Sequence, residues 1–344
     1  MTVARRVLLL LVLLLIVAAG GGALYASRWL DRPLAVGPRP VTVEIRTGQP
    51  LGGVARELAA QGLLEHPQWL AWYGHWTGQD ARMRAGEYAV QPGTSPRTLL
   101  TLFESGAIVQ HSVTIVEGWT FREARKVLAK EPNLTHVTNG LSDEEVMARL
   151  GEQGTPAEGR FFPDTYLFGK GARDIDILRQ ARDRMRKELD KAWAHRQENL
   201  PLQDESQALI LASIVERETG NAAERSRIAG VFVERLRRGM RLQTDPSVIY
   251  GLGEKFDGNL RRADLERDGP YNTYTRTGLP PTPIALPSAD SLRAAVQPDD
   301  RGELFFVATG LGDGTHVFSR TLQEHEKAVR QYLVRYRQQN SGGR

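Results

Sequence analysis

The sequence contains no cysteine, and this absence removes several classes of chemistry at once. Disulfides, thiolate zinc sites, cysteine nucleophiles and a lipid anchor on cysteine are all excluded. The 7 histidines are scattered without metal-ligand spacing, so no metal site is expected. The chain also lacks a G-x-S-x-G turn, a phosphate-binding P-loop and a dinucleotide fingerprint, so no cofactor is expected. What remains is chemistry carried by carboxylates and polar loops.

The chain also lacks a strong excess of either basic or acidic residues. The 344 residues include 45 basic and 41 acidic side chains, which gives a net charge of +4. No basic stripe interleaved with aromatic residues runs along the chain, so nucleic acid is not an expected partner. The length is sufficient for one large domain, or for two modest domains with extensions.

A long apolar run lies at the N-terminus. Residues Val7–Ala26 carry no charge, and about 20 apolar residues suffice to cross a bilayer as a helix. Arg5 and Arg6 precede this run, which predicts a cytoplasmic N-terminus with the rest of the chain outside the cytoplasm. The alternative is a cleaved signal peptide with its site near Ala18–Ala19. Because the apolar character continues past that point, we expect an uncleaved single-pass anchor in the inner (plasma) membrane.

Residues 28–40 are polar and rich in proline, which predicts a linker between membrane and body. Over residues 41–108 we expect the order strand, helix, helix, strand, with glycine turns ahead of the helices. This pattern resembles a LysM module, a small domain that binds N-acetylated glycans. A further strand-turn-helix unit is expected over residues 109–154.

One helix of this module is unusually aromatic. Trp69, Trp72, Tyr73 and Trp76 fall at helical spacing and share one face. Sugar stacking is one possible role for them. An aromatic stripe at this spacing is more often core packing, so we expect these side chains to fill the core.

The stretch Ala208–Gly220 has the strongest chemical signal in the chain. It begins as an apolar helical run and ends in Glu216 and Glu218, shortly before a glycine that predicts the end of the helix. Carboxylates near a helix C-terminus face the negative end of the helix dipole, which favours their protonated form. A general acid needs a raised pKa of this kind. The alternative is a solvated helix end with two surface glutamates.

The last third of the chain is rich in polar loops. Met240–Gly253 contains a Gln-Thr-Asp-Pro turn, and Pro270–Ser288 combines aromatic, amide, hydroxyl and proline residues without a helical or strand period. Long ordered loops in compact domains are usually functional. We expect a buried strand at Leu304–Gly310 that pairs with Gly314–Thr321 in a hairpin.

The position of two glutamates on one helix restricts the mechanism. Glycoside cleavage usually needs two carboxyl groups on opposite sides of the bond, whereas residues two apart on a helix point about 200° from each other. One carboxyl group suffices if the substrate supplies the rest. In N-acetylmuramic acid (MurNAc), the acetamido group can stabilise the oxocarbenium ion and the 6-hydroxyl can be the nucleophile. A single glutamate can then act as acid and afterwards as base.

Several motifs in a fixed order resemble the endolytic murein transglycosylase (YceG-like) family. They are VEGWT, FFPDTY, ASIVERETG, MRLQTDPSVIYGLG, YNTYTRTGLPPTPIALPS, DSLRAAVQP, and LFFVATG followed by GTHVFS. The resemblance covers nearly the whole chain and implies a membrane-anchored lytic transglycosylase, a carbon–oxygen lyase. Such an enzyme cuts the MurNAc-β-1,4-GlcNAc bond within nascent peptidoglycan strands and leaves 1,6-anhydroMurNAc ends. The resemblance also implies work beside the peptidoglycan synthases (penicillin-binding proteins) and a limit on glycan strand length.

The resemblance assigns roles to individual residues. It implies that Glu218, in the Glu-Thr pair, is the catalytic acid and base, and that Glu216 is structural or an electrostatic neighbour. The expected substrate contacts lie in the two polar loops: Gln243, Thr244, Asp245, Tyr250, Asn272, Thr273 and Tyr274. Amide and hydroxyl groups suit an oxyanion-like role or orientation of the acetamido group. Each of these side chains could instead brace its loop.

These features predict an α+β protein with a single transmembrane helix. Its expected parts are a cytoplasmic stub with the transmembrane helix (1–27), the linker (28–40), the LysM-like module (41–108), a strand-turn-helix extension (109–154), a mixed α+β catalytic domain (155–338) and a disordered tail (339–344). Two other functions stay open. A peptidoglycan hydrolase would need a second carboxylate, for which Asp164 and Asp245 are the candidates. A non-catalytic glycan-binding scaffold of the cell-wall synthesis complex would need neither.

Overall fold

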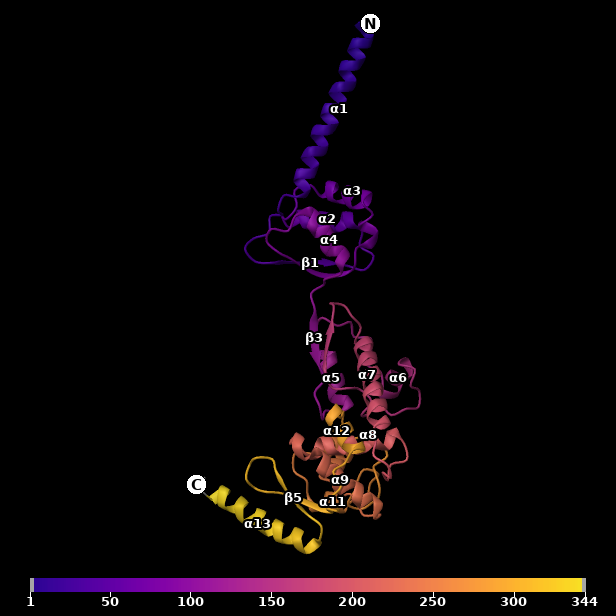
Figure 1. Cartoon of the computed structure of the whole chain (residues 1–344), viewed down its shortest axis with the longest axis vertical. Coiled ribbons are helices and arrows are strands. Elements are labelled where there is room, and N and C mark those ends of the chain that lie inside the picture. Colours follow the sequence, from indigo (N-terminus) through magenta and orange to yellow (C-terminus); the bar gives the residue numbers. More distant parts are fainter. Residues whose placement is uncertain (1–2, 342–344) are drawn as a thin grey trace. The chain divides into compact units, whose positions relative to one another are not determined.

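The computed structural model describes residues 3–341. Two compact units divide the chain: unit 1 contains the chain up to His111 together with Leu167–Ala172, and unit 2 contains Ser112–Tyr166 and the chain from Arg173 onward. In the part of the chain that the structure describes, many helices are combined with short two-stranded sheets (Figure 1). This combination confirms the predicted α+β class.

Unit 1 begins with a long helix and continues as a small α+β module. Its elements are α1 (Val3–Leu30), β1 (Val41–Ile45), α2 (Leu51–Ala60), α3 (Pro67–Trp76), the 3-10 turn η1 (Asp80–Arg82), β2 (Gly86–Val90) and α4 (Pro96–Ser105). Strands β1 and β2 pair antiparallel, with Val43 opposite Tyr88. The expected order of strand, helix, helix and strand is therefore present.

Helix α1 contains an apolar stretch, Leu9–Leu30, that is long and apolar enough to cross a membrane. The side chains of Leu9–Val17 are exposed. At its other end, Trp29 and Leu30 are buried in the core of the module together with Leu34. The first residues of the expected linker thus belong to the folded module, because their apolar side chains reach its core.

The aromatic residues of α3 do not pack as expected. Leu70 and Gly74 form the buried face of this helix. A Cβ at Gly74 would lie 2.2 Å from Leu51 Cδ2, so a side chain there would push α2 and α3 apart. Trp72 and Trp76 are 66% and 72% exposed. The expectation of core packing is wrong for these two residues, because Leu70 and Gly74, one turn apart, already occupy the line that faces the core.

Unit 2 is larger and mainly helical. Its elements are α5 (Phe121–Lys130), α6 (Asp143–Arg149), α7 (Asp174–Ala194), α8 (Glu205–Glu218), η2 (Ala222–Glu224), α9 (Arg225–Arg237), α10 (Asp245–Leu252), η3 (Gly253–Lys255), α11 (Arg262–Glu266), α12 (Ala289–Val296), β5 (Phe305–Ala308), β6 (His316–Ser319) and α13 (Leu322–Ser341). A further two-stranded sheet is formed by β3 (His111–Thr114) and β4 (Thr165–Phe168), and the boundary between the units runs through both strands.

Two details of the C-terminal part differ from the expectations. The hairpin of β5 and β6 is present and antiparallel, but β5 is only half-buried. The expectation of a buried strand is wrong, because a sheet of two strands leaves much of its surface uncovered. Helix α13 continues to Ser341, so residues 339–341 of the expected tail are helical. The rest of that tail, residues 342–344, lies outside the described residues.

Helix α8 lies within the core of unit 2. Its residues Ala208–Val215 are buried without interruption, and it contacts α7, α9, α10 and α12 (Figure 1). The helix starts at a proper cap, since the side chain of Asp204 accepts a hydrogen bond of 2.9 Å from Gln207 N. A helix packed on all sides moves little, so the end that carries the two glutamates is held firmly in place.

Candidate active site

The two glutamates occupy the last turn of α8. The helix ends at Glu218, and Thr219 follows in an extended conformation with φ −143° and ψ 135°. Glu216 and Glu218 point to different sides of the helix, since they are two residues apart. Their surroundings differ accordingly.

Glu216 takes part in a buried ion pair. Its side chain is 5% exposed, and its Oε1 lies 3.3 Å from Nη2 of Arg225, the first residue of α9. Its Oε2 accepts hydrogen bonds from the backbone N (2.8 Å) and Oγ (2.5 Å) of Ser288, the N-cap of α12. These contacts join the end of α8 to the starts of two neighbouring helices. Contacts of this kind suit a structural role, and that role stays a prediction.

Glu218 is held by a hydroxyl group and not by a cation. Thr244 Oγ1, at the N-cap of α10, donates a hydrogen bond of 2.7 Å to Glu218 Oε2. None of the described residues donates a hydrogen bond to Glu218 Oε1. Oε1 is therefore the oxygen that is free to carry a proton and to deliver it.

Thr244 is itself fixed by a network of hydroxyl groups. Its backbone N donates to Thr273 Oγ1 at 3.0 Å, and Ser247 Oγ donates to its carbonyl oxygen at 2.8 Å. The hydroxyl oxygens of Ser247 and Thr273 lie 2.9 Å apart. All three side chains are buried. The network joins the two polar loops of the sequence at the position of Glu218.

The surroundings of Glu218 shift its pKa upward. Burial of the carboxyl group is the main cause; the charge of Asp245 acts in the same direction, while the Thr244 hydrogen bond and the charges of His316 and Arg235 act against it. Because the pKa is raised, the group stays protonated at pH values at which an exposed glutamate is ionised. A general acid must be in this protonation state.

Gln243, next to Thr244, has a backbone conformation that is rare for its residue type. Its φ is +50°, a conformation that costs about 1–3 kcal/mol and persists where the surroundings enforce it. Its backbone N donates to Thr273 O at 3.1 Å. On the other side, the buried Arg235 donates to the carbonyl oxygen of Leu242 at 2.7 Å. The side chain of Gln243 is exposed, and its Oε1 accepts a long hydrogen bond of 3.5 Å from Arg235 Nη1; contact with a ligand stays a prediction.

The remaining residues of the second loop fall into two groups. Tyr274 Oη donates a hydrogen bond of 2.5 Å to Asp245 Oδ1, the exposed carboxylate that starts α10. Asn272, in contrast, is buried, and its Nδ2 donates to the carbonyl oxygens of Asp264, Leu265 and Arg267. In the structure Asn272 and Thr273 brace the loop, and contact of their side chains with a substrate stays a prediction.

Tyr250 is hydrogen-bonded to the carboxyl group of Glu158, which the sequence analysis did not identify as a site residue. Its Oη donates to Glu158 Oε2 at 3.2 Å, and the backbone N of Phe121 donates to Glu158 Oε1 at 3.0 Å. Burial raises the pKa of Glu158 to about 7. In the sequence, Glu158 is a single acidic residue shortly before the aromatic pair Phe161 and Phe162. Its partners come from α5 and α10, which lie far from it along the chain, so no local pattern links them to it.

The two candidates for a second carboxylate lie in different places. Asp164 forms an ion pair with Arg184 of α7, and its Oδ1 accepts from the backbone N of Thr165. No described contact joins it to Glu218. Asp245 directly follows Thr244, and its charge acts on Glu218. Of the two candidates, only Asp245 lies near Glu218.

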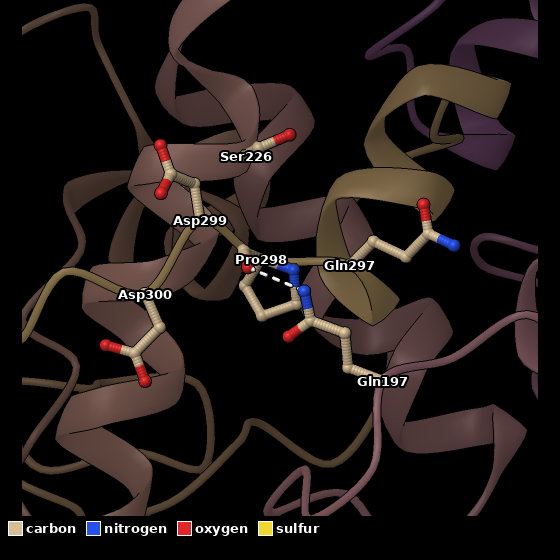
Figure 2. A pocket seen from close by; sticks show the side chains of 6 residues that line it. All are labelled: Gln197, Ser226, Gln297, Pro298, Asp299 and Asp300. Atoms are coloured by element: carbon tan, nitrogen blue, oxygen red, sulfur yellow. Dashed lines mark hydrogen bonds between the residues drawn. The ribbon is translucent and has the colours of Figure 1, made fainter.

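A large open pocket of unit 2 does not include these residues. It has a volume of about 700 Å³ and is lined by Gln197, Ser226, Gln297, Pro298, Asp299 and Asp300 (Figure 2). The dashed line in Figure 2 marks the hydrogen bond of 3.1 Å from Gln197 Nε2 to the carbonyl oxygen of Pro298. Asp299 is paired with Arg301, and Asp300 with Arg237. Since both carboxylates already have cationic partners, the pocket offers no free acid or base.

Glu218 has a raised pKa, lies at the end of a buried helix and is held by one hydroxyl group, which are properties that a general acid needs. The elements that build this site lie within a region that matches a known family: the sequence profile of the YceG-like family matches residues 43–331. The chain belongs to this family. The match spans α8, α10 and both polar loops, and therefore every candidate site residue.

Individual relatives agree with this assignment. The chain is 29% identical over 310 residues to the endolytic murein transglycosylase of Bacillus subtilis (strain 168), and the alignment covers 85% of each protein. It is 27% identical to the endolytic murein transglycosylase of Streptococcus pneumoniae (strain D39), with 85% of this chain but 58% of the relative covered. The crystal structure of a yceG-like protein of Listeria monocytogenes matches with a TM-score of 0.53 and 29% identity, over 85% of this chain and 99% of that one.

Proposed function

We propose that this protein is a membrane-anchored endolytic lytic transglycosylase of peptidoglycan, with Glu218 as its acid and base. Its family and its alignment with murein transglycosylases over 85% of its length support the reaction class. One observation carries the assignment of the acid: Glu218 has a raised pKa, and Thr244 holds one of its oxygens while the other stays free. In Glu216, by contrast, both carboxylate oxygens are occupied, one by Arg225 and the other by Ser288.

The proposed reaction uses no water. Glu218 gives its proton to the oxygen that joins C1 of MurNAc to the next GlcNAc, and the bond from C1 to that oxygen breaks. The acetamido group of MurNAc stabilises the positive charge at C1. The 6-hydroxyl oxygen of the same sugar then bonds to C1, and its proton goes to the Glu218 carboxylate. The products are a 1,6-anhydroMurNAc end and a new GlcNAc end, and the acid is restored.

Helix α1 supports the proposed placement of the protein in the membrane. Its apolar stretch of 22 residues is the proposed single-pass anchor in the inner (plasma) membrane, with the N-terminus cytoplasmic and both units on the outer, periplasmic or extracytoplasmic side. Unit 1 is the proposed LysM-like module. Penicillin-binding proteins are the proposed partners, and the proposed role is to limit the length of nascent glycan strands.

A hydrolase of the same glycan is the second candidate, because Asp245 lies close enough for its charge to raise the pKa of Glu218. A retaining or inverting hydrolase would use such a carboxylate as nucleophile or base. Mass spectrometry of the products distinguishes the two reactions. The full-length protein, solubilised in detergent, is incubated with uncrosslinked peptidoglycan strands.

Under the proposal, the new MurNAc ends are one water lighter than reducing ends, and Glu218→Gln abolishes their formation while the protein remains folded. Reducing ends that disappear in Asp245→Asn would establish the hydrolase. Equal cleavage by the wild type and Glu218→Gln would refute the assignment of the acid.

A further inference from the structure

Unit 1 exposes three tryptophans on one short helix. Trp69, Trp72 and Trp76 of α3 are 37%, 66% and 72% exposed. The rings of Trp72 and Trp76 are parallel, with centroids 6.1 Å apart and an interplanar angle of 2°. Leu70 and Gly74 form the buried face that packs α3 against the module, so the exposed tryptophan rings are not required for that packing. Contiguous exposed apolar side chains of this kind mark interaction surfaces.

Aromatic contacts tie α3 to the end of α1. Trp69 packs edge-on against Tyr25, with centroids 5.8 Å apart, and against Trp29, with centroids 5.4 Å apart. Figure 1 shows α3 beside the end of α1, running across the direction of that helix, with α2, α4 and β1 on its far side. The exposed face of α3 therefore lies on the side of the module from which α1 leaves.

The apolar run of α1 ends close to Tyr25 and Trp29. The uncharged run that begins at Val7 ends at Ser27, and Arg28 follows. Tyrosine concentrates at the interface between lipid and water, and the exposed Tyr25 stands where the outer interface is expected, while Trp29, one turn later, is already buried in the module. Trp69 touches both and must lie at nearly the same depth. Helix α3 has ten residues and is about 15 Å long, so Trp72 and Trp76 are one and two turns farther along the same plane.

We propose that α3 is a second membrane contact, in which Trp72 and Trp76 insert into the headgroup region of the leaflet that α1 leaves. This inference rests on α1 being the membrane anchor of the proposed function. Continuity with the anchor favours lipid over any other occupant of this face. Arg28 and Arg32, which are exposed where the chain leaves α1, supply cations for lipid phosphates. Unit 1 is then fixed at the membrane surface by two contacts, and the α3 face is closed to glycan.

Labelling with a fluorophore tests this contact, because a chain without cysteine accepts one label at one introduced cysteine. Gln68 is exposed on α3 and lies one turn before Trp72, so Gln68→Cys reports the position of the helix and leaves the tryptophans intact. Leu15→Cys reports the anchor, and Gln91→Cys, exposed in the loop after β2, reports the aqueous side. Each full-length variant is labelled with an environment-sensitive dye and reconstituted into phosphatidylglycerol–phosphatidylethanolamine vesicles that contain lipid-bound quencher.

The proposal expects three distinct results. The label at position 15 is strongly quenched, the label at position 68 is blue-shifted and quenched, and the label at position 91 behaves as in water. Adding Trp72→Ala and Trp76→Ala to the Gln68→Cys variant should remove most of the shift and quenching at position 68 without changing position 15 in a matching variant. If position 68 behaves like position 91 while position 15 is quenched, the docking of α3 is refuted and the anchor stands. If position 15 is also unquenched, the anchor and the docking are both refuted.

Discussion

Thr244 Oγ1 and Glu218 Oε2 lie 2.7 Å apart, although 26 residues separate them in the chain. This contact connects the start of α10 to the end of α8. Its effect on the pKa of Glu218 is downward, against the larger upward effect of burial. Thr244 therefore limits how far the pKa of the acid rises, and it stabilises the carboxylate that forms when the proton leaves.

Replacing Thr244 by valine should slow cleavage. Valine keeps the shape of the side chain but cannot donate a hydrogen bond to the carboxylate that forms in the transition state. A hydrogen bond to a charged group contributes about 1.5–3 kcal/mol, so we expect kcat to fall by roughly 10- to 100-fold. Steady-state kinetics on uncrosslinked glycan strands measures this loss. The control is Thr244→Ser, which keeps the hydroxyl group and should retain most of the activity; a Thr244→Val variant as active as this control would contradict the role of the hydrogen bond.

The pH profile of cleavage should report the raised pKa of Glu218. The reaction starts from the protonated acid, so the rate falls as the pH rises through the pKa of Glu218 in the free enzyme. Because that pKa is raised, the fall should lie above the range in which an exposed glutamate titrates. In Thr244→Val it should move to still higher pH, since a hydrogen bond that lowers the pKa is lost. A profile of kcat/KM against pH for both proteins measures the pH at which the rate falls and the direction in which Thr244→Val shifts it. A shift to lower pH in the variant would argue against Glu218 as the acid.

The sequence predicted the local features of the site and missed the distant ones. The apolar run of α8, its end near Glu218 and the polar nature of both loops are local patterns. The partners that separate the roles of the glutamates are not local, because Ser288 is 72 residues from Glu216 and Thr244 is 26 residues from Glu218. Such contacts depend on tertiary packing, which no periodicity encodes.

The same limit explains what was misjudged in unit 1. Helical spacing placed the aromatic residues of α3 on one surface of a helix, but spacing does not say which surface faces the core. Gly74 decided this, because the absence of a side chain lets Leu51 approach the helix there. The bulky tryptophans were thereby left outside.

Glu216 and Glu218 should respond in opposite ways to the same substitution. Glu216→Gln breaks a buried ion pair and leaves the charge of Arg225 poorly compensated, so we expect the free energy of unfolding to fall by about 3 kcal/mol. Its cleavage products should still be anhydro ends. Glu218→Gln should destabilise the protein far less than Glu216→Gln, because it breaks no ion pair and the amide oxygen still accepts the hydrogen bond of Thr244, yet it should abolish cleavage. Thermal unfolding and product analysis of both variants test these two roles. A Glu216→Gln variant that is stable but inactive would indicate that Glu216, and not Glu218, is the acid.

Glu158 should make the protein less stable as the pH rises. Its pKa is about 7 in the folded protein, against 4.5 for an ordinary glutamate. Between these values the unfolded chain has lost the proton while the folded protein still binds it, so the free energy of unfolding falls with rising pH. The difference of 2.5 pKa units, 7 minus 4.5, corresponds to a loss on the order of 3 kcal/mol. The stability that the protonated Glu158 contributes to the folded protein is fully present below about pH 4.5 and is lost above about pH 7.

Denaturant unfolding at a series of pH values from 4 to 8 measures this slope. Glu158→Gln should flatten it, because the amide cannot ionise, while its oxygen can still accept the hydrogen bond from the backbone N of Phe121. Glu254 is the matched control, since its side chain is 84% exposed and Glu254→Gln should leave the slope unchanged. If both variants keep the slope of the wild type, another group causes the pH dependence. If only Glu158→Gln loses it, Glu158 is the group whose raised pKa causes the pH dependence.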